Sequence, residues 1–456
     1  MAAPEPARPH AHLHLAGFFG FGPAYVWSEA PGPHVYYDFA AWRRLAATAE
    51  RGLFSTLFLG DSQRLREHLG RVTDHSVTGR PDQLVLFAHL AAVTERIGLV
   101  ATLNTTFTDP ADLARRLSTV DLLSGGRAGW NVVTTDNDWT GENFRRGAEV
   151  THDDRYRHAA EHLGTVEALW SGWPPGAVAD ATDAPAWSRP AAITPVVRGA
   201  RRARPALPPS AQGRPVLFQA GESPQGREFA ARHAQGVFSR YLRFDEALAF
   251  ADDLRARLVR HGRPADDIRI FPATRVILGD TDAEAREKAA WFRDRTWSER
   301  RIRSVVEAVW GHDLSDHDVD GPLPASDPVA ATQTLTHGVV NTSDRPLRTA
   351  AAWRELAAAR GFSMRDLVLH LNDAVEFVGT PSAVADELTR YVRAGALDGL
   401  NLQPNAVPDG FDDVVDRLVP ALQDRGAYRT AYEGTTLREN LGLLPAVADR
   451  APAVPG

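Results

Sequence analysis

The distribution of apolar and polar positions along the chain predicts strands and helices in regular alternation. Short apolar runs bounded by glycine or polar residues predict buried strands, and longer stretches with apolar residues every three or four positions predict helices. Eight strands are expected, at residues 13–19, 55–59, 97–101, 129–133, 216–219, 236–239, 268–274 and 399–403. Helices are expected between them, among others at residues 39–51, 151–170, 224–233, 245–261 and from 282.

Eight strand–helix units predict an α/β fold of the (β/α)₈ TIM-barrel type, which lets a single domain take up residues 1–456. Two segments interrupt the alternation. Residues 171–214 are rich in proline, alanine and arginine, and the region near 290–330 contains the polar run GHDLSDHDVDGPLPASD at 311–327. Long connections in a compact domain are commonly lids, so both segments are expected to be lids or insertions.

The overall composition indicates a globular protein that binds neither membranes nor nucleic acid. The chain is 43% hydrophobic, and no run reaches the roughly 18 apolar residues of a membrane span. The first twelve residues lack the apolar stretch of a secretory signal, so a cytoplasmic location is expected. With 51 basic and 58 acidic residues, the net charge of −7 provides no basic surface for nucleic acid.

Several classes of catalytic chemistry lack their residues. There is no cysteine, which excludes disulfides, thiolate nucleophiles and cysteine-bound metals. Lys288 is the only lysine, and it lies in a charged stretch expected to be exposed, which argues against Schiff-base chemistry. Zinc-peptidase, serine-hydrolase and P-loop motifs are also missing. His312, Asp313 and Asp316–Asp318 include metal-ligand types, but their spacing is irregular and no metal site is predicted.

Polar residues follow or interrupt three consecutive predicted strands. Asp61 ends the second strand, Thr102 follows the third, and Asn131 lies within the fourth. Each residue alone has an ordinary structural explanation as a cap, turn or loop contact. Active sites of (β/α)₈ barrels lie at the carboxyl ends of the strands, so the three together favour a ligand site.

The segment 122–156 combines flexible backbone with polar side chains. Gly125, Gly126 and Gly129 allow backbone conformations and close approaches that a Cβ would block. Further on, THDDRY at 151–156 predicts a helix start with a capping box. His152 and Tyr156 are four residues apart, so on a helix they would meet a ligand from one side. The acidic residues after His152 are expected to raise its pKa.

The fifth strand leads into a second capped helix, through the sequence QAGESPQG at 219–226. Ser223 is predicted as the N-cap and Pro224 as the first helical residue. Backbone N–H groups and the helix dipole would then face the end of the strand, where a phosphate can bind. A plain helix cap without a ligand is the alternative.

These motifs resemble those of one enzyme family along nearly the whole chain. SGGRAGWNVVT at 124–134, THDDRY at 151–156, GRPVLFQAGES at 213–223 and RTAYEGTTLRENLGL at 429–443 are similar to the bacterial luciferase-like flavin monooxygenases. The resemblance is to the branch with nitrilotriacetate, long-chain alkane and dibenzothiophene sulfone monooxygenases. It implies a TIM-barrel homodimer or homotetramer that receives reduced FMN (FMNH₂) from a separate NAD(P)H-dependent flavin reductase.

In such enzymes O₂ adds to FMNH₂ to give a C4a-peroxyflavin, which oxygenates a small hydrophobic or heteroatom-containing substrate. The resemblance places FMN at Asp61, Thr102, Asn131, His152, Tyr156 and Ser223, with Asn131 and His152 as the catalytic pair. It also implies that Tyr156 and Ser223 lie on the phosphate side.

The resemblance does not identify the substrate or the outcome of the reaction. After the first strand, the relatives usually have a histidine and a Trp-Arg pair, whereas this chain reads GFFGFGPAYVW at 17–27. FMNH₂-dependent dehydrogenation or rearrangement in secondary metabolism is therefore kept as an alternative. A noncatalytic flavin-binding protein is a second alternative, and deazaflavin is the cofactor of other branches.

Overall fold

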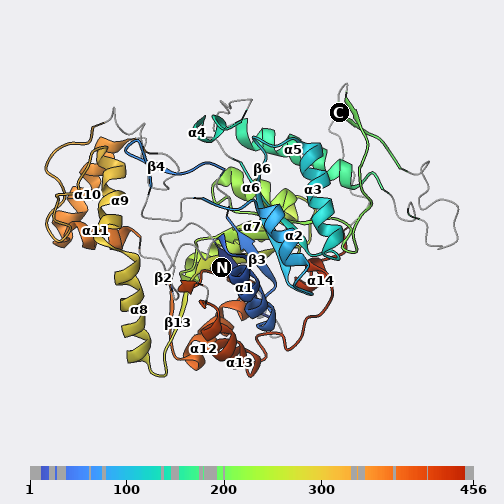
Figure 1. Ribbon diagram of the computed structural model, residues 1–456. Helices are drawn as coiled ribbons and strands as arrows, with labels where there is room; N and C mark the ends of the chain where they lie inside the picture. The colour runs from blue at the N-terminus through green and yellow to red at the C-terminus, as the bar shows by residue number, and fades with distance from the viewer. Residues whose placement is uncertain are drawn as a thin grey trace.

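The computed structural model describes residues 12–19, 26–27, 37–60, 63–73, 79–134, 138–144, 154–173, 178, 193–198, 201–329, 336, 345–372, 376–407 and 409–446. At its centre is a closed barrel of eight parallel strands in the order β1-β15-β12-β11-β10-β7-β6-β3 (Figure 1). The strands are β1 (His14–Phe19), β3 (Thr56–Leu59), β6 (Gly98–Asn104), β7 (Ala128–Val133), β10 (Val216–Gln219), β11 (Gly236–Ser239), β12 (Arg269–Thr274) and β15 (Gly399–Leu402).

The predicted (β/α)₈ barrel is confirmed, and each predicted strand corresponds to a barrel strand. The largest difference is in β6, which was expected to end at residue 101 and continues to Asn104. The extra residues stay in the sheet because Leu103 and Asn104 pair with Val132 and Val133 of β7. β6 therefore reaches beyond Thr102 toward the end of the barrel where active sites are found.

Helices cover the outside of the barrel, and several begin at a capping side chain. Asp38, Asp109 and Ser223 each accept a hydrogen bond from a backbone N–H of the helix that follows. The apolar helix faces pack against outward-pointing strand residues such as Leu99 and Trp130. These helices are α1 (Phe39–Arg51), α2 (Gln83–Ala91), α3 (Pro110–Leu123), α5 (Asp154–Trp170), α6 (Pro224–His233), α7 (Phe244–Arg260), α12 (Pro381–Arg393) and α13 (Val419–Gln423), the last preceded by a π-helical turn at Val414–Leu418.

The short helix α14 (Leu437–Asn440) closes the end of the barrel where the strands begin. A Cβ added to Gly98 would lie 2.4 Å from Leu437 Cδ1, and one added to Gly129 would lie 3.2 Å from Leu437 Cδ2. The two glycines thus leave the space that Leu437 fills. Thr436 and Glu439 fix the start of α14 with a capping box.

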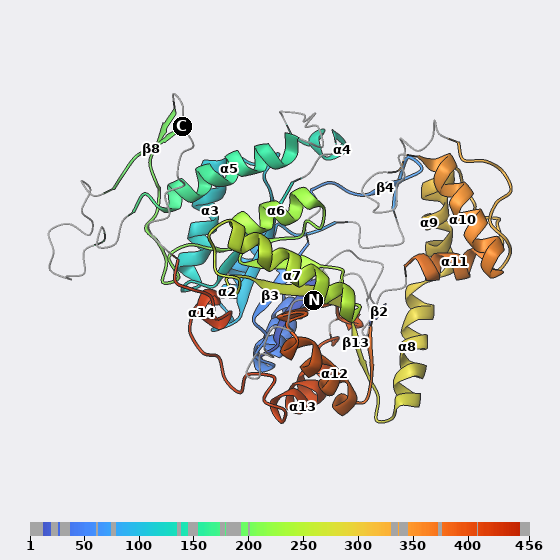
Figure 2. The ribbon, with the colours of Figure 1, turned by 180° about the vertical axis from the view of Figure 1, so that it is seen from behind.

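A helical insertion, described at residues 282–329 and 345–371, lies beside the barrel in both views of the ribbon (Figures 1 and 2). It contains α8 (Asp282–Thr296), α9 (Glu299–Trp310), α10 (Pro346–Arg360) and α11 (Met364–Leu371). The insertion has an apolar core separate from that of the barrel. Trp310 is fully buried in this core, which also includes Leu314, Val319 and Leu323. The region near 290–330 was expected to be a lid or insertion, and the pattern did not predict α9, α10 or α11. Its role as a lid stays a prediction.

Smaller sheets decorate the barrel. The hairpin of β4 (Glu67–His68) and β5 (Arg71–Val72) belongs to the connection from β3 to α2. A second hairpin lies within the predicted insertion 171–214, and two parallel pairs flank the barrel. These elements are β8 (Val196–Arg198) with β9 (Arg201–Ala203), β13 (Val276–Leu278) with β14 (Phe377–Gly379), and β2 (Val26–Trp27) with β16 (Ala406–Val407). In the described part of the chain, no helix is long and apolar enough to cross a membrane.

Candidate active site

The side chains inside the barrel form layers, and one layer combines two phenylalanines with two asparagines. Strands of a barrel tilt against its axis, so residues of equal height shift steadily in register from strand to strand. The strand pairings place Phe58, Asn131, Phe238 and Asn401 at one level, contributed by the alternate strands β3, β7, β11 and β15. In this layer the phenylalanines occupy two opposite walls and the asparagines the other two.

The phenylalanines fill the middle of the barrel. The rings of Phe58 and Phe238 stack with their centroids 4.0 Å apart. Phe218, from the layer below, stacks on Phe238 at 5.3 Å, and Phe18, from the layer above, stacks on Phe58 at 4.9 Å. The stacked rings therefore form an aromatic floor beneath the open end of the barrel.

Asn131 is held in this floor with one of its two polar atoms unused. Its Nδ2 donates to Thr102 Oγ1 at 3.1 Å, and Thr102 Oγ1 donates in turn to the carbonyl oxygen of Leu59 at 2.6 Å. Among the described residues, the buried Oδ1 of Asn131 has no hydrogen-bond partner. Since an unsatisfied buried carbonyl is costly, this atom is a candidate acceptor for a ligand hydrogen bond. The structure thus brings the predicted residues Thr102 and Asn131 together.

Asn401 places a second unpartnered amide oxygen on the opposite wall, and the sequence reasoning did not identify it. It is 2% exposed, and its Oδ1 also has no partner within the described part of the chain. A signal was present, because Gly129-Trp130-Asn131 in β7 and Gly399-Leu400-Asn401 in β15 share the pattern glycine, large apolar residue, asparagine. In both strands, a Cβ added to the glycine would meet side chains inside the barrel. The glycine therefore faces inward, and so does the asparagine two residues later.

The layer above the floor is open on one side. Ala220 and Ala273 occupy two of its four positions. Ala273 lies in β12 and Ala220 directly follows β10, and the register places both above the asparagine level. Ala220 is exposed and Ala273 is partly exposed, whereas Thr102 in the same layer is buried. Small side chains therefore leave space at the barrel mouth, on the side from which α6 begins.

The start of α6 lies beside this opening. Ser223 is the N-cap, as predicted, and its Oγ accepts from Gly226 N at 3.1 Å. A Cβ on Gly226 would lie 2.8 Å from the backbone of Gly221 and 3.0 Å from the hydroxyl oxygen of Tyr156. The predicted residues Tyr156 and Ser223 are therefore neighbours around one tight, glycine-lined turn, where a helix N-terminus favours an anion.

Two of the predicted flavin-contacting residues, Asp61 and His152, lie outside the described residues. Gly60, which precedes Asp61, is described, and its carbonyl oxygen accepts from Arg80 Nη1 at 2.9 Å. Helix α5 is described from Asp154 onward. The roles of Asp61 and His152, and the capping box expected at Thr151, stay predictions.

Buried titratable groups with shifted pKa values occur in the outer layer, away from the mouth. Burial lowers the pKa of His162 to about 4, and its Nε2 lies 3.2 Å from the carbonyl oxygen of Thr108. Burial raises the pKa of Asp121 to about 6, although Ser210 and Gln212 donate hydrogen bonds to its carboxylate. These groups join helices and connections on the outside of the barrel, so their role is structural.

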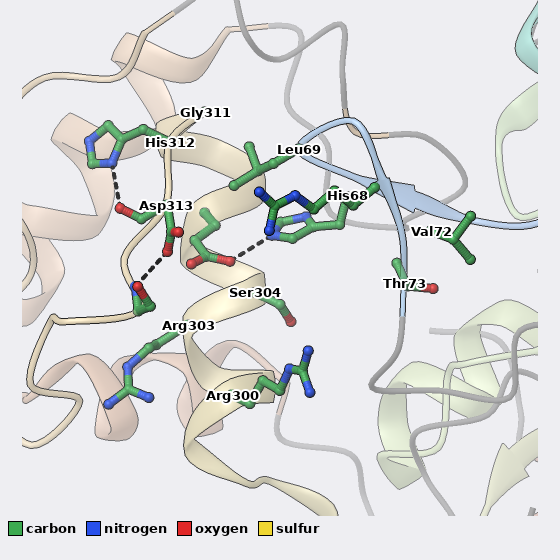
Figure 3. Close-up of a pocket in the computed structure, with 13 residues that line it drawn as sticks. His68, Leu69, Val72, Thr73, Arg300, Arg303, Ser304, Gly311, His312 and Asp313 are labelled. Carbon is green, nitrogen blue, oxygen red and sulfur yellow. Dashed lines mark hydrogen bonds and ion pairs between the residues drawn. The ribbon is translucent and has the colours of Figure 1, made fainter.

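A cavity of about 690 Å³ lies between the β4–β5 hairpin and α9 (Figure 3). It is lined by the hairpin, α9 and residues 311–315, without a barrel strand. Across it His68 Nε2 contacts Glu307 Oε2 at 2.6 Å, and both side chains are nearly buried. No group of metal ligands occurs in the described ranges, which include the acidic run at 311–327.

Comparison with known proteins assigns the family. Residues 20–398 match the sequence model of the luciferase-like monooxygenases, so the chain belongs to this family. The predicted enzyme class is confirmed.

Two curated relatives extend along most of the chain. A pristinamycin IIA synthase subunit from Streptomyces pristinaespiralis is 38% identical over 95% of this chain and 97% of its own length. Nitrilotriacetate monooxygenase component A of Aminobacter aminovorans is 33% identical over 90% of this chain and 91% of its own. A crystal structure of riboflavin lyase with modified FMN and substrate riboflavin aligns with a TM-score of 0.76 at 27% identity, covering 94% of this chain and 96% of that one.

Proposed function

We propose that the protein is a two-component monooxygenase that binds reduced FMN at the barrel mouth and uses O₂ to oxygenate a small hydrophobic or heteroatom-containing molecule. The observation that carries the proposal is the unpartnered Oδ1 of Asn131, which lies below an opening that leads to the start of α6. Family membership supports flavin use, and so does the relative whose crystal structure contains modified FMN.

The described residues fit the parts of FMN. The isoalloxazine ring has N–H groups and flat apolar faces, which suit the free acceptor of Asn131 and the aromatic floor. The phosphate suits the first turn of α6, where Ser223 caps the helix and Tyr156 places its hydroxyl against Gly226. Asp61, His152 and Thr102 complete the proposed flavin set.

Reduced FMN, when bound, supplies the electrons for O₂ activation. The protein side chains then orient the ring and control water and protons. Asn131 fixes the ring through its amide, Phe58 and Phe238 exclude water from below, and His152 is proposed to supply a proton at the ring edge. The helical insertion, connected to the β4–β5 hairpin by His68 and Glu307, is proposed to act as a lid.

An NAD(P)H-dependent flavin reductase is the proposed partner, because the chain resembles a protein named as component A of a monooxygenase. A homodimer or homotetramer in the cytoplasm is proposed from the same family resemblance. The substrate is proposed to be a small organic molecule.

The experiment is an anaerobic titration of the purified protein with FMNH₂, followed by rapid mixing with O₂. We expect saturable binding of FMNH₂ and an O₂-dependent spectral change that free FMNH₂ does not show. Absence of FMNH₂ binding would overturn the proposal. Tight binding of oxidised FMN without an altered reaction with O₂ would instead support a noncatalytic flavin-binding protein.

The same site supports a second outcome, FMNH₂-dependent dehydrogenation or rearrangement, and the similarity to a relative named as a synthase favours testing it. Turnover under ¹⁸O₂ separates the two once a substrate is found. A product that contains ¹⁸O supports oxygenation, and a product without it supports the alternative.

A further inference from the structure

We propose that Asn401 is a positioning residue that selects reduced over oxidised flavin, by accepting a hydrogen bond from an N–H that the ring gains on reduction. The inference rests on the proposed function and deepens it. In the closed barrel, β15 is four strands from β7 in either direction. Asn401 and Asn131 therefore face the interior from opposite walls at the same level.

The two amides differ in how they are held, but both present a carbonyl oxygen. Asn131 uses Nδ2 to bind Thr102, which fixes the orientation of its amide and leaves Oδ1 as the free atom. In the described structure, Oδ1 of Asn401 is likewise buried without a partner. Two acceptors inside an otherwise apolar layer require a donor, because a carbonyl buried without one costs about 1–3 kcal/mol.

The flavin ring changes its donors with its redox state. N5 of the oxidised ring is a bare acceptor, whereas N5 of the reduced ring carries a hydrogen. An acceptor in the protein attracts the reduced form and is left unsatisfied opposite the oxidised form. A pair of acceptor oxygens in the layer below the barrel mouth thus favours the form of flavin that a reductase delivers.

The opening above this layer is compatible with such a ring. Ala220, directly after β10, and Ala273 of β12 lie one level above and leave room between the two asparagine walls. Phe58 and Phe238 form a flat surface below the same space. The asparagine layer contains Phe58, Phe238 and the two asparagines. Asn401 is thus its polar residue on the wall opposite Asn131.

The test compares dissociation constants for FMNH₂ and FMN in the wild type, Asn401→Leu and a control, Asn405→Leu. Leucine keeps the branching and the number of side-chain heavy atoms of asparagine but removes the acceptor. Asn405 also has a buried Oδ1 without a partner in the described structure, yet its Nδ2 donates to Val276 O outside the barrel, at 2.6 Å. We expect Asn401→Leu to weaken FMNH₂ binding about tenfold, the equivalent of roughly 1.4 kcal/mol, and to leave FMN binding within twofold.

A direct readout is the ¹⁵N NMR shift of N5 in bound, ¹⁵N-labelled FMNH₂, which we expect to move in Asn401→Leu and to stay in Asn405→Leu. Asn401→Ala provides a second variant if the leucine does not fold. Equal weakening of both flavin forms, or an unchanged N5 shift, would overturn the role of Asn401 while leaving the proposed function intact. Failure of the wild type to bind FMNH₂ would overturn both.

Discussion

The amide oxygens of Asn131 and Asn401 lie at one level on opposite walls of the barrel, and neither has a hydrogen-bond partner among the described residues. Each asparagine lies two positions after a glycine that faces the inside of the barrel. Functional sites commonly keep such unsatisfied groups at a cost in stability. Substitutions at these two asparagines and in the elements around them therefore test the stability of the protein and its binding of flavin.

The first prediction is that Asn401→Leu stabilises the flavin-free protein. Replacing an unpartnered buried carbonyl by an apolar group of the same branching removes its desolvation cost, so the free energy of unfolding should rise by about 1 kcal/mol. Urea unfolding without flavin measures this change. A fall in stability would show that the carbonyl is satisfied in the empty protein.

The second prediction concerns the phosphate. Tyr156→Phe removes the hydroxyl that lies against Gly226 at the start of α6, so affinity for FMNH₂ should fall about tenfold, as for the loss of one hydrogen bond to a charged group. Reduced riboflavin, which has no phosphate, should bind equally well to the variant and the wild type. An equal loss for both ligands would place the hydroxyl near the ring instead.

The third prediction is a pH dependence of stability. The pKa of His162 is about 4 in the folded protein and near 6.5 when unfolded. Its neutral form is therefore favoured by folding, and stability present above pH 6.5 is lost as the pH falls toward 4, by at most about 3 kcal/mol. His162→Gln should make the free energy of unfolding less dependent on pH in this window.

Asp121 provides a control, because its shifted pKa changes the pH dependence of stability in the opposite direction. The pKa of Asp121 is raised to about 6, so its contribution to stability increases as the pH falls from 6 to 4. Asp121→Asn removes that contribution, and unfolding should become more sensitive to acid than in the wild type. Equal pH profiles for the two variants would contradict both assignments.

The fourth prediction concerns the helical insertion as a lid. Glu307→Gln weakens the contact with His68 but leaves an oxygen to accept from Leu314 N. We expect H₂O₂ to be released several-fold faster after the FMNH₂-bound protein is mixed with O₂, because water reaches the site more easily, with FMNH₂ affinity unchanged. Arg365→Gln is the matched control, since it breaks an exposed ion pair with Asp320 in the same insertion. The lid role is wrong if the two variants release H₂O₂ at equal rates.

The strands were predictable because burial on both faces leaves a local pattern. Runs such as Val216–Gln219 and Gly236–Ser239 are short, apolar and bounded by polar or glycine residues, so their bounds agree with the prediction. The N-cap at Ser223 was predictable for the same reason, since caps depend on neighbours in sequence.

The pairing of Asn131 with Asn401 was not predictable from local pattern. It depends on strand order and register around the closed barrel, which bring together residues far apart in the chain. The insertion and a helix from residue 282 were expected, but α9, α10 and α11 were not predicted. Leu314, Val319 and Leu323 are anchored by contacts with helices, although their own segment lacks helical periodicity.

The plug formed by Leu437 has a consequence for how the chain is made. The end of the barrel where the strands begin is closed by Leu437, which follows β15 in sequence. Arg429 also follows β15, and it donates a hydrogen bond to His14 in the first strand, 415 positions earlier. During synthesis, the first strands leave the ribosome long before the helix that seals them. Until then Gly98 and Gly129 border an unfilled hole, so a nascent chain stalled after β15 would be a substrate for chaperones and proteases rather than a partly active enzyme.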